Sequence, residues 1–151
     1  YSIDPNAIDY RCKVKFQEPR QELVKELSGM VSAAIRNFYD NSKHLPTKII
    51  FYRDGVSEGQ FDQVAKSEIE AILDTLKFVS QTTKRPQPTL TFIVVGKKHH
   101  IRFFPSPDLA DAKENALPGT VIDTDITTPE PNQFDFYLQS HAGLMYVYYR
   151  R

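Results

Sequence analysis

IIFYRDGVSEGQF, at residues 49–61, joins a predicted strand to a predicted helix through an acidic turn. Its first residues are largely apolar, β-branched or aromatic, which favours a strand. We expect this strand to cover 47–54 and to end at Asp54, because Gly55 permits backbone angles that a strand cannot keep. Ligands of open α/β sheets bind outside the carboxyl ends of the strands, so Asp54 is a candidate site residue. The alternative is that Asp54 only starts a turn, as Asp followed by Gly often does.

The residues after this turn predict a helix and a second strand. Ser57 and Gln60 have the spacing of a capping box, which marks a helix start. Apolar residues then recur every three or four positions to about Gln81, as on one face of a helix. The run LTFIVV at 90–95 is apolar on both faces, like a buried parallel strand. Strand, helix and strand together predict a βαβ unit and an α/β fold.

The residues before this unit predict another strand and another helix. Apolar and basic residues alternate over 10–16, which indicates a strand with one buried and one solvated face. Pro19 suits the first position of a helix, and apolar residues continue from there at helical spacing for roughly twenty residues. Glu22 would then lie in the first helical turn, where the helix dipole favours a carboxylate without any function.

The composition limits the class of protein. A chain of 151 residues fits one domain with its own core. Its 19 basic and 19 acidic residues cancel, so any nucleic-acid contact must come from a local cluster. The single cysteine, Cys12, excludes an intrachain disulfide. We find no apolar run long enough to span a bilayer and no signal peptide, and therefore expect a soluble intracellular domain without a membrane partner.

Two further clusters could contact an anion. The basic run KKHHIR at 97–102 follows the second predicted strand, and Lys98, His100 and Arg102 would share one face of an extended segment, spaced to meet successive phosphates. The alternative is a solvated basic loop. His141, after the last predicted strand at 134–138, could meet an anion or could be an ordinary packed histidine.

Five further motifs follow one another along the chain: RQE at 20–22, IIFYRDGVSEGQ at 49–60, the segment 93–102 with its KKHHIR, PGTVID at 118–123 and FDFYLQSHAG at 134–143. Together they resemble the PIWI domain of a eukaryotic Argonaute. Their order and spacing resemble the family across nearly the whole chain. The resemblance implies that residues 1–151 are a partial PIWI domain with an RNase H-like α/β fold. It further implies a mixed sheet flanked by helices and incomplete at both ends.

The resemblance also implies roles for single residues. Asp54 corresponds to an aspartate of the metal-binding slicer site, and Glu22 to the glutamate that enters this site from a neighbouring segment. Lys98, His100 and Arg102 match positions that hold the phosphates of a guide RNA, and His141 lies in a segment that also approaches the guide. The implied cofactor is Mg²⁺, or Mn²⁺, which in two-metal sites activates water for phosphodiester cleavage.

The chain also departs from the family pattern. The family's first catalytic aspartate would precede Tyr1, its fourth ligand would follow Arg151, and the tail 144–151 lacks the usual continuation. We therefore expect a fragment, a divergent or alternatively spliced form, or part of a longer protein. By itself the chain is expected not to cleave RNA, because half of the implied metal ligands are absent.

The resulting hypothesis concerns the protein to which this chain would belong. That protein would bind a small guide RNA and direct the recognition, and by the resemblance the slicing, of complementary target RNA in gene silencing. Its partners would be the guide, the target and proteins of the silencing complex, in the cytoplasm and also in the nucleus. The main alternative is a non-catalytic PIWI-fold domain that binds a guide or another protein; an unrelated α/β nuclease is a further one.

Overall fold

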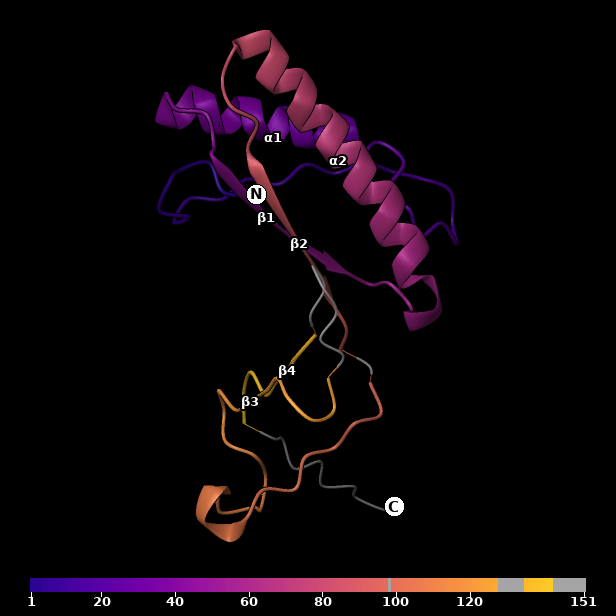
Figure 1. Ribbon diagram of the computed structural model, residues 1–151, viewed down its shortest axis with the longest axis vertical. Coiled ribbons are helices and arrows are strands. Elements are labelled where there is room, and N and C mark those ends of the chain that lie inside the picture. Colours follow the sequence, from indigo (N-terminus) through magenta and orange to yellow (C-terminus); the bar gives the residue numbers. More distant parts are fainter. Residues whose placement is uncertain (98, 128–134, 143–151) are drawn as a thin grey trace, which may run out of the picture. The chain divides into compact units, whose positions relative to one another are not determined.

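The computed structural model describes residues 1–97, 99–127 and 135–142, apart from the side chain of Glu58, and divides the chain into the units Tyr1–His99 and His100–Arg151 (Figure 1). The first unit contains the predicted βαβ unit. Strand β1 (Lys48–Asp54) pairs in parallel with β2 (Thr89–Val95), and helix α2 (Phe61–Thr83) connects them. The strand register places Asp54 opposite Val95, so both strands end at the same edge.

One face of the two strands forms the core of this unit. Helices α1 (Leu27–Ser42) and α2 lie on the same side of the strands (Figure 1). Phe51 and Phe92 stack with their ring centroids 5.1 Å apart beneath them. The buried residues of the core cluster are Leu27, Ile35, Ile72 and Leu76. Among the described residues of this unit, none covers the other face: Tyr52 on β1 is 66% exposed, and Thr91 on β2 is exposed as well. The prediction that β2 is buried on both faces is therefore wrong for this unit.

The predicted strand at 10–16 is not formed. The described backbone over 11–18 has no regular structure, and Phe16 is fully exposed. An isolated bridge joins Ser2 to Tyr10 instead. A strand forms only where its backbone groups find a partner strand. Arg11 exchanges backbone hydrogen bonds with Tyr1, both at 2.9 Å, but none of the described residues pairs with the backbone of 12–16.

The first helix begins later than predicted, at Leu27 rather than near Pro19. Pro19 lies in a turn, and the following Arg20 has a φ of 64°, which no α-helix contains. The backbone before α1 finds other partners: the side-chain amide of Gln17 donates to the carbonyls of Gln21 and Leu23, at 2.8 and 3.1 Å. Glu22 therefore lies in an irregular segment and not in a first helical turn.

The start of α2 also differs from the prediction. A short 3-10 turn, Glu58–Gln60, precedes the helix, and Gln60 stands at the N-cap without a side-chain capping bond. The capping box of Ser57 and Gln60 is therefore wrong. Gly55 has a φ of 77°, which confirms that a glycine is needed where the strand turns.

The second unit contains two short strands. Strands β3 (Val121–Ile122) and β4 (Tyr137–Leu138) pair antiparallel, and a 3-10 turn covers Pro107–Leu109. The ring of Tyr137 meets that of Phe103 edge to face, with centroids 5.6 Å apart. The strand predicted at 134–138 is confirmed at its end, while Phe134 lies outside the described residues. The α/β class is confirmed, as a parallel pair and a separate antiparallel pair within the described residues.

None of the helices in the described part of the chain is both long enough and apolar enough to cross a bilayer.

Candidate functional site

Asp54 lies at the carboxyl edge of the parallel strands, as predicted. One oxygen of its exposed carboxylate, Oδ1, accepts the N–H of Gly55 at 2.8 Å. The other, Oδ2, accepts from the Nζ of Lys97 at 2.6 Å. Lys97 follows β2 closely, so two segments distant in sequence meet at this edge. The sequence placed Lys97 in the basic run but gave no sign that it pairs with Asp54.

The ion pair changes the titration of Asp54. The hydrogen bond from Lys97 is the largest influence and lowers the pKa of this carboxyl below its ordinary 3.8, with smaller contributions from the charge of Lys97 and the N–H of Gly55. A lowered pKa stabilises the folded state above the pKa of the unfolded chain, and this contribution is lost as the pH falls through the folded value. The relevant window therefore lies below pH 3.8.

We expect Lys97→Met to raise the pKa of Asp54 toward its ordinary value, because the main cause of the shift is removed. NMR titration of the side-chain carboxyl carbon measures this directly. Lys48→Met is the matched control, since Lys48 is also exposed and stands at the opposite end of β1. Equal pKa values of Asp54 in the Lys97→Met variant and the unchanged chain would contradict the ion pair.

The carboxylate of Glu22 faces the turn after β1. Its Oε2 accepts from the backbone N–H and the hydroxyl of Ser57, both at 3.5 Å. Gln60, with its amide nitrogen placed on the side of the carboxylate, donates to the same oxygen at 2.5 Å. The two residues of the expected capping box thus bind Glu22 instead of capping α2.

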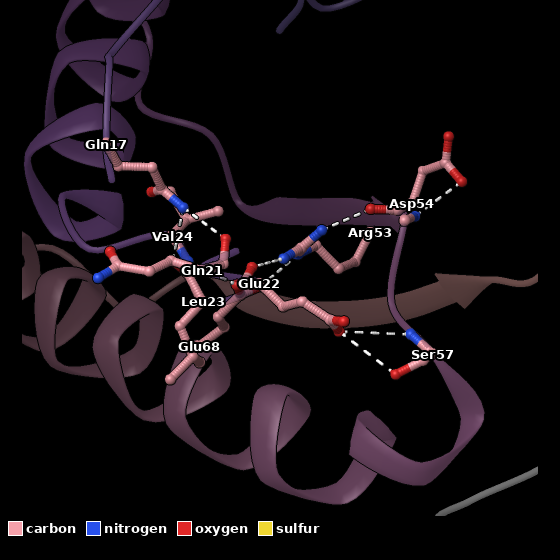
Figure 2. A network of polar contacts seen from close by, with 10 residues as sticks. Gln17, Gln21, Glu22, Leu23, Val24, Arg53, Asp54, Ser57 and Glu68 are labelled. Carbon is pink, nitrogen blue, oxygen red and sulfur yellow. Dashed lines mark hydrogen bonds and ion pairs between the residues drawn. The ribbon is translucent and has the colours of Figure 1, made fainter. Parts of the chain in front are cut away.

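A buried ion pair, Arg53 with Glu68, lies near the backbone of both Glu22 and Asp54 (Figure 2). The Nε of Arg53 donates to Oε2 of Glu68 at 2.8 Å, and their side chains are only 12% and 2% exposed. The guanidinium also donates to the backbone carbonyls of Asp54, at 2.5 Å, and Glu22. Sequence reasoning missed this pair. Two patterns in the sequence could have indicated it. Arg53 is two residues after Phe51, on the face of β1 that points to the core, and Glu68 lies among the apolar residues on the buried face of α2.

The structure therefore brings the segments of Glu22 and Asp54 together but not their carboxylates. Figure 2 shows the Glu22 carboxylate directed to Ser57, while the Asp54 carboxylate points away from that turn. Carboxylates are ligands that Mg²⁺ prefers. Within the described residues, however, no group of three or more His, Cys, Asp or Glu side chains could hold a metal ion. These two residues supply at most part of a site.

The predicted phosphate-binding residues are only partly described. Lys98 lies outside the described residues. His100 and Arg102 belong to the second unit, where both are exposed in a segment without helix or strand. A guanidinium nitrogen of Arg102 donates to the carbonyl of Ile101 at 2.9 Å. The expected row on one face of an extended segment remains a prediction.

His141 is exposed rather than packed in a core. Its Nδ1 lies 2.8 Å from the hydroxyl of Ser140, and its carbonyl accepts from the side-chain amide of Gln139 at 2.7 Å. The contact with Ser140 orients the ring at the end of β4, and the side chain stays exposed to solvent. The position allows contact with an anion.

Comparison with known proteins gives the family context. The model of the Piwi domain family matches residues 1–147. Protein argonaute 12 of rice is 41% identical over 155 aligned positions, which cover 93% of this chain and 14% of the rice protein. The chain thus spans a small part of that curated relative.

Solved structures agree with the sequence matches. The C-terminal lobe of a budding yeast Argonaute superposes with a TM-score of 0.72 at 31% identity, covering 84% of this chain and 27% of that one. Drosophila Piwi superposes with a TM-score of 0.64 at 33% identity, and the match covers 78% of this chain and 15% of the Piwi chain. An Argonaute of Kluyveromyces polysporus, solved with a guide RNA, superposes with a TM-score of 0.67 at 30% identity, and the match covers 83% of this chain and 15% of that Argonaute. The predicted RNase H-like α/β fold is confirmed by these matches.

Proposed function

We propose, from the premise that this chain belongs to the Piwi domain family of Argonaute proteins, that it contributes to the binding of a small guide RNA. The guide would direct recognition of complementary RNA in gene silencing. The observation that carries the proposal is the edge at which β1 and β2 end, where Asp54 meets Lys97 and the run KKHHIR begins. The Kluyveromyces polysporus relative holding a guide RNA supports it.

The groups proposed to hold the guide are suited to its backbone. Lys98, His100, Arg102 and His141 can all donate hydrogen bonds, and phosphate oxygens accept them. Contacts of this kind position a strand without identifying its bases. The sequence of the target would then be selected by pairing with the guide, as in other RNA-guided proteins.

Replacing Lys98 and Arg102 together by alanine is therefore expected to weaken RNA binding by the same factor for every sequence. Fluorescence anisotropy with three unrelated single-stranded RNAs of guide length measures the three affinities at one salt concentration. The paired control is Lys66→Ala with Lys77→Ala, which removes the same charge from exposed positions on α2. Unchanged affinities, or a loss confined to one sequence, would refute the assignment.

For the longer protein we propose metal-dependent cleavage of the target, with Asp54 and Glu22 as acidic residues of the site. A bound Mg²⁺ or Mn²⁺ would supply an activated water and stabilise the leaving oxygen. The part assigned to this chain is to supply two carboxylates from neighbouring segments, Asp54 at the end of β1 and Glu22 at the turn that follows it. The remaining ligands would come from outside the residues that the structure describes.

The isolated chain is accordingly expected not to cleave RNA in the presence of Mg²⁺. Incubation of the purified chain with a labelled guide and target duplex, followed by gel electrophoresis, tests this expectation. Cleavage that depends on Mg²⁺ and disappears in Asp54→Ala would contradict this expectation and show that the chain by itself forms a sufficient site.

A non-catalytic guide-binding domain is the second candidate function. It is favoured by the present partners of the two carboxylates, since Lys97 neutralises Asp54 and the Ser57 turn holds Glu22. A cleavage assay on the guide-loaded longer protein separates the two candidates. Cut target RNA supports the catalytic function, and bound but uncut target RNA supports the non-catalytic one.

A further inference from the structure

We infer that Phe104 binds a base of the RNA by stacking, beside the side chains proposed to hold the phosphates. The inference rests on the proposed function, which places an RNA backbone on Lys98, His100 and Arg102. It adds a contact of a different kind, because a phenylalanine ring has no hydrogen-bond donor for a phosphate but has a flat face for a base.

Phe104 leaves a large apolar ring in water. The residue is 91% exposed. An exposed phenylalanine forgoes the favourable free energy that burial of its ring would contribute. Single exposed apolar residues are nevertheless common on protein surfaces, so the exposure has meaning only together with the surroundings of the ring.

The segment around Phe104 directs its side chains alternately to the protein and to solvent. It has neither helix nor strand, yet Phe103 and Pro105 are partly buried, and the residues before each of them, Arg102 and Phe104, are exposed. Pro105 restricts the residue before it to extended backbone angles. Ser106 is extended as well, with a φ of −65° and a ψ of 155°. Side chains two residues apart in an extended backbone point the same way, so Arg102 and Phe104 share the solvent side.

Contacts on the protein side order the backbone that carries Phe104. The ring of Phe103 meets the ring of Tyr137 edge to face, with centroids 5.6 Å apart. Tyr137 belongs to β4, which pairs with β3, so this contact ties the segment to a sheet. After Phe104, the ring of Pro105 fixes its own φ. The exposed ring therefore projects from a backbone that is already ordered, and a preorganised group loses less entropy when it binds a ligand.

A basic side chain beside an exposed aromatic ring is a combination that suits single-stranded RNA. Proteins that bind such strands hold the backbone with positive charges and stack the bases on aromatic rings. Arg102 supplies the charge and Phe104 the ring, roughly 6–7 Å apart along an extended backbone. In a nucleotide the ribose likewise separates the phosphate from the base, so one strand can reach both side chains. Stacking is tolerant of base identity, which suits a guide of any sequence.

Replacing Phe104 by alanine is expected to raise the Kd for single-stranded RNA by about fivefold to a hundredfold. Fluorescence anisotropy measures the Kd of an unpaired RNA of guide length and of the same strand without its bases. The abasic strand should bind Phe104→Ala and the unchanged chain equally, since only the base contact is lost. Phe78→Ala is the matched control, because Phe78 is another exposed aromatic residue but lies on α2, and both strands should bind this variant normally.

A fluorescence readout detects the stacking directly. The chain contains no tryptophan, so Phe104→Trp introduces a single indole at this position. Indole offers a larger face than phenyl, and this variant should bind RNA at least as tightly as the unchanged chain. A base stacked on an indole quenches its emission. We expect RNA to quench the emission of Phe104→Trp, whereas the abasic strand should not, and RNA should not quench the control Phe78→Trp.

The two experiments distinguish a failure of the inference from a failure of the proposed function. Equal RNA affinities of Phe104→Ala and the unchanged chain would overturn the inference. An equal loss of affinity for RNA and for the abasic strand would also overturn it, as would unquenched emission of Phe104→Trp with RNA bound. If the unchanged chain binds neither strand, the proposed contacts with the RNA backbone are refuted, and the inference falls with them.

Discussion

Glu68→Ala is expected to lower the free energy of unfolding of the chain by about 3–5 kcal/mol. The change removes one member of a buried ion pair and leaves the guanidinium of Arg53 without its carboxylate. It also leaves the N–H of Val24 without an acceptor. An unsatisfied buried donor costs about 1–3 kcal/mol, in addition to the uncompensated charge.

Urea denaturation followed by circular dichroism measures this loss. The double variant Arg53→Met with Glu68→Leu is the informative comparison, because replacing a buried ion pair by apolar residues of similar volume is often close to neutral. We expect it to recover the part of the loss that comes from the uncompensated charge, while the N–H of Val24 still lacks its acceptor. A loss below about 1 kcal/mol in Glu68→Ala would place this pair among weak surface ion pairs and contradict its burial.

Leu76→Ala is expected to cost about 2–5 kcal/mol of unfolding free energy. Leu76 is fully buried, in a cluster with Leu27, Ile35 and Ile72. The truncation removes apolar contacts and leaves a cavity that the two helices cannot fully close.

Leu73→Ala is the control for this second prediction. Leu73 lies on the same helix and is 38% exposed, so the change in helix propensity is the same while the cavity is smaller. We expect it to cost less than half as much in the same denaturation experiment. Equal losses at the two positions would mean that α2 does not pack on the strands as described.

The central βαβ unit could be predicted from the sequence because each of its signals is local. The predicted strand 47–54 differs from β1 by one residue, and the helix expected to end near Gln81 ends at Thr83. Apolar periodicity and the glycine after Asp54 sufficed for both. The parallel pairing followed from the helix between the strands.

The errors lie where strand partners or side chains, rather than apolar periodicity, decide the course of the backbone. Alternation over 10–16 indicates that a strand could form there, but it contains no information on whether a partner strand exists in the chain. The helix predicted from Pro19 starts at Leu27 because Gln17 and Glu68 bind the intervening backbone. No periodicity in the sequence reports such contacts.

In the candidate site, too, local features could be predicted from the sequence and contacts between segments could not. The position of Asp54 at a strand end is confirmed, whereas its pairing with Lys97 depends on the register of β1 and β2. The role expected for Ser57 and Gln60 was wrong because Glu22 competes for the same donors. The clearest missed signal was a pair of charges on inward-facing positions, Arg53 and Glu68, since buried charges require partners.

The salt dependence of RNA binding tests the central claim, that this chain holds an RNA backbone through its basic segment. The logarithm of the binding constant falls linearly with the logarithm of the salt concentration, by about 0.7 for each phosphate contact with a single strand. Replacing Lys98 and Arg102 by alanine should therefore make the slope about 1.4 less steep, while the Lys66 and Lys77 control keeps the slope of the unchanged chain. Equal slopes for all three proteins would contradict the account.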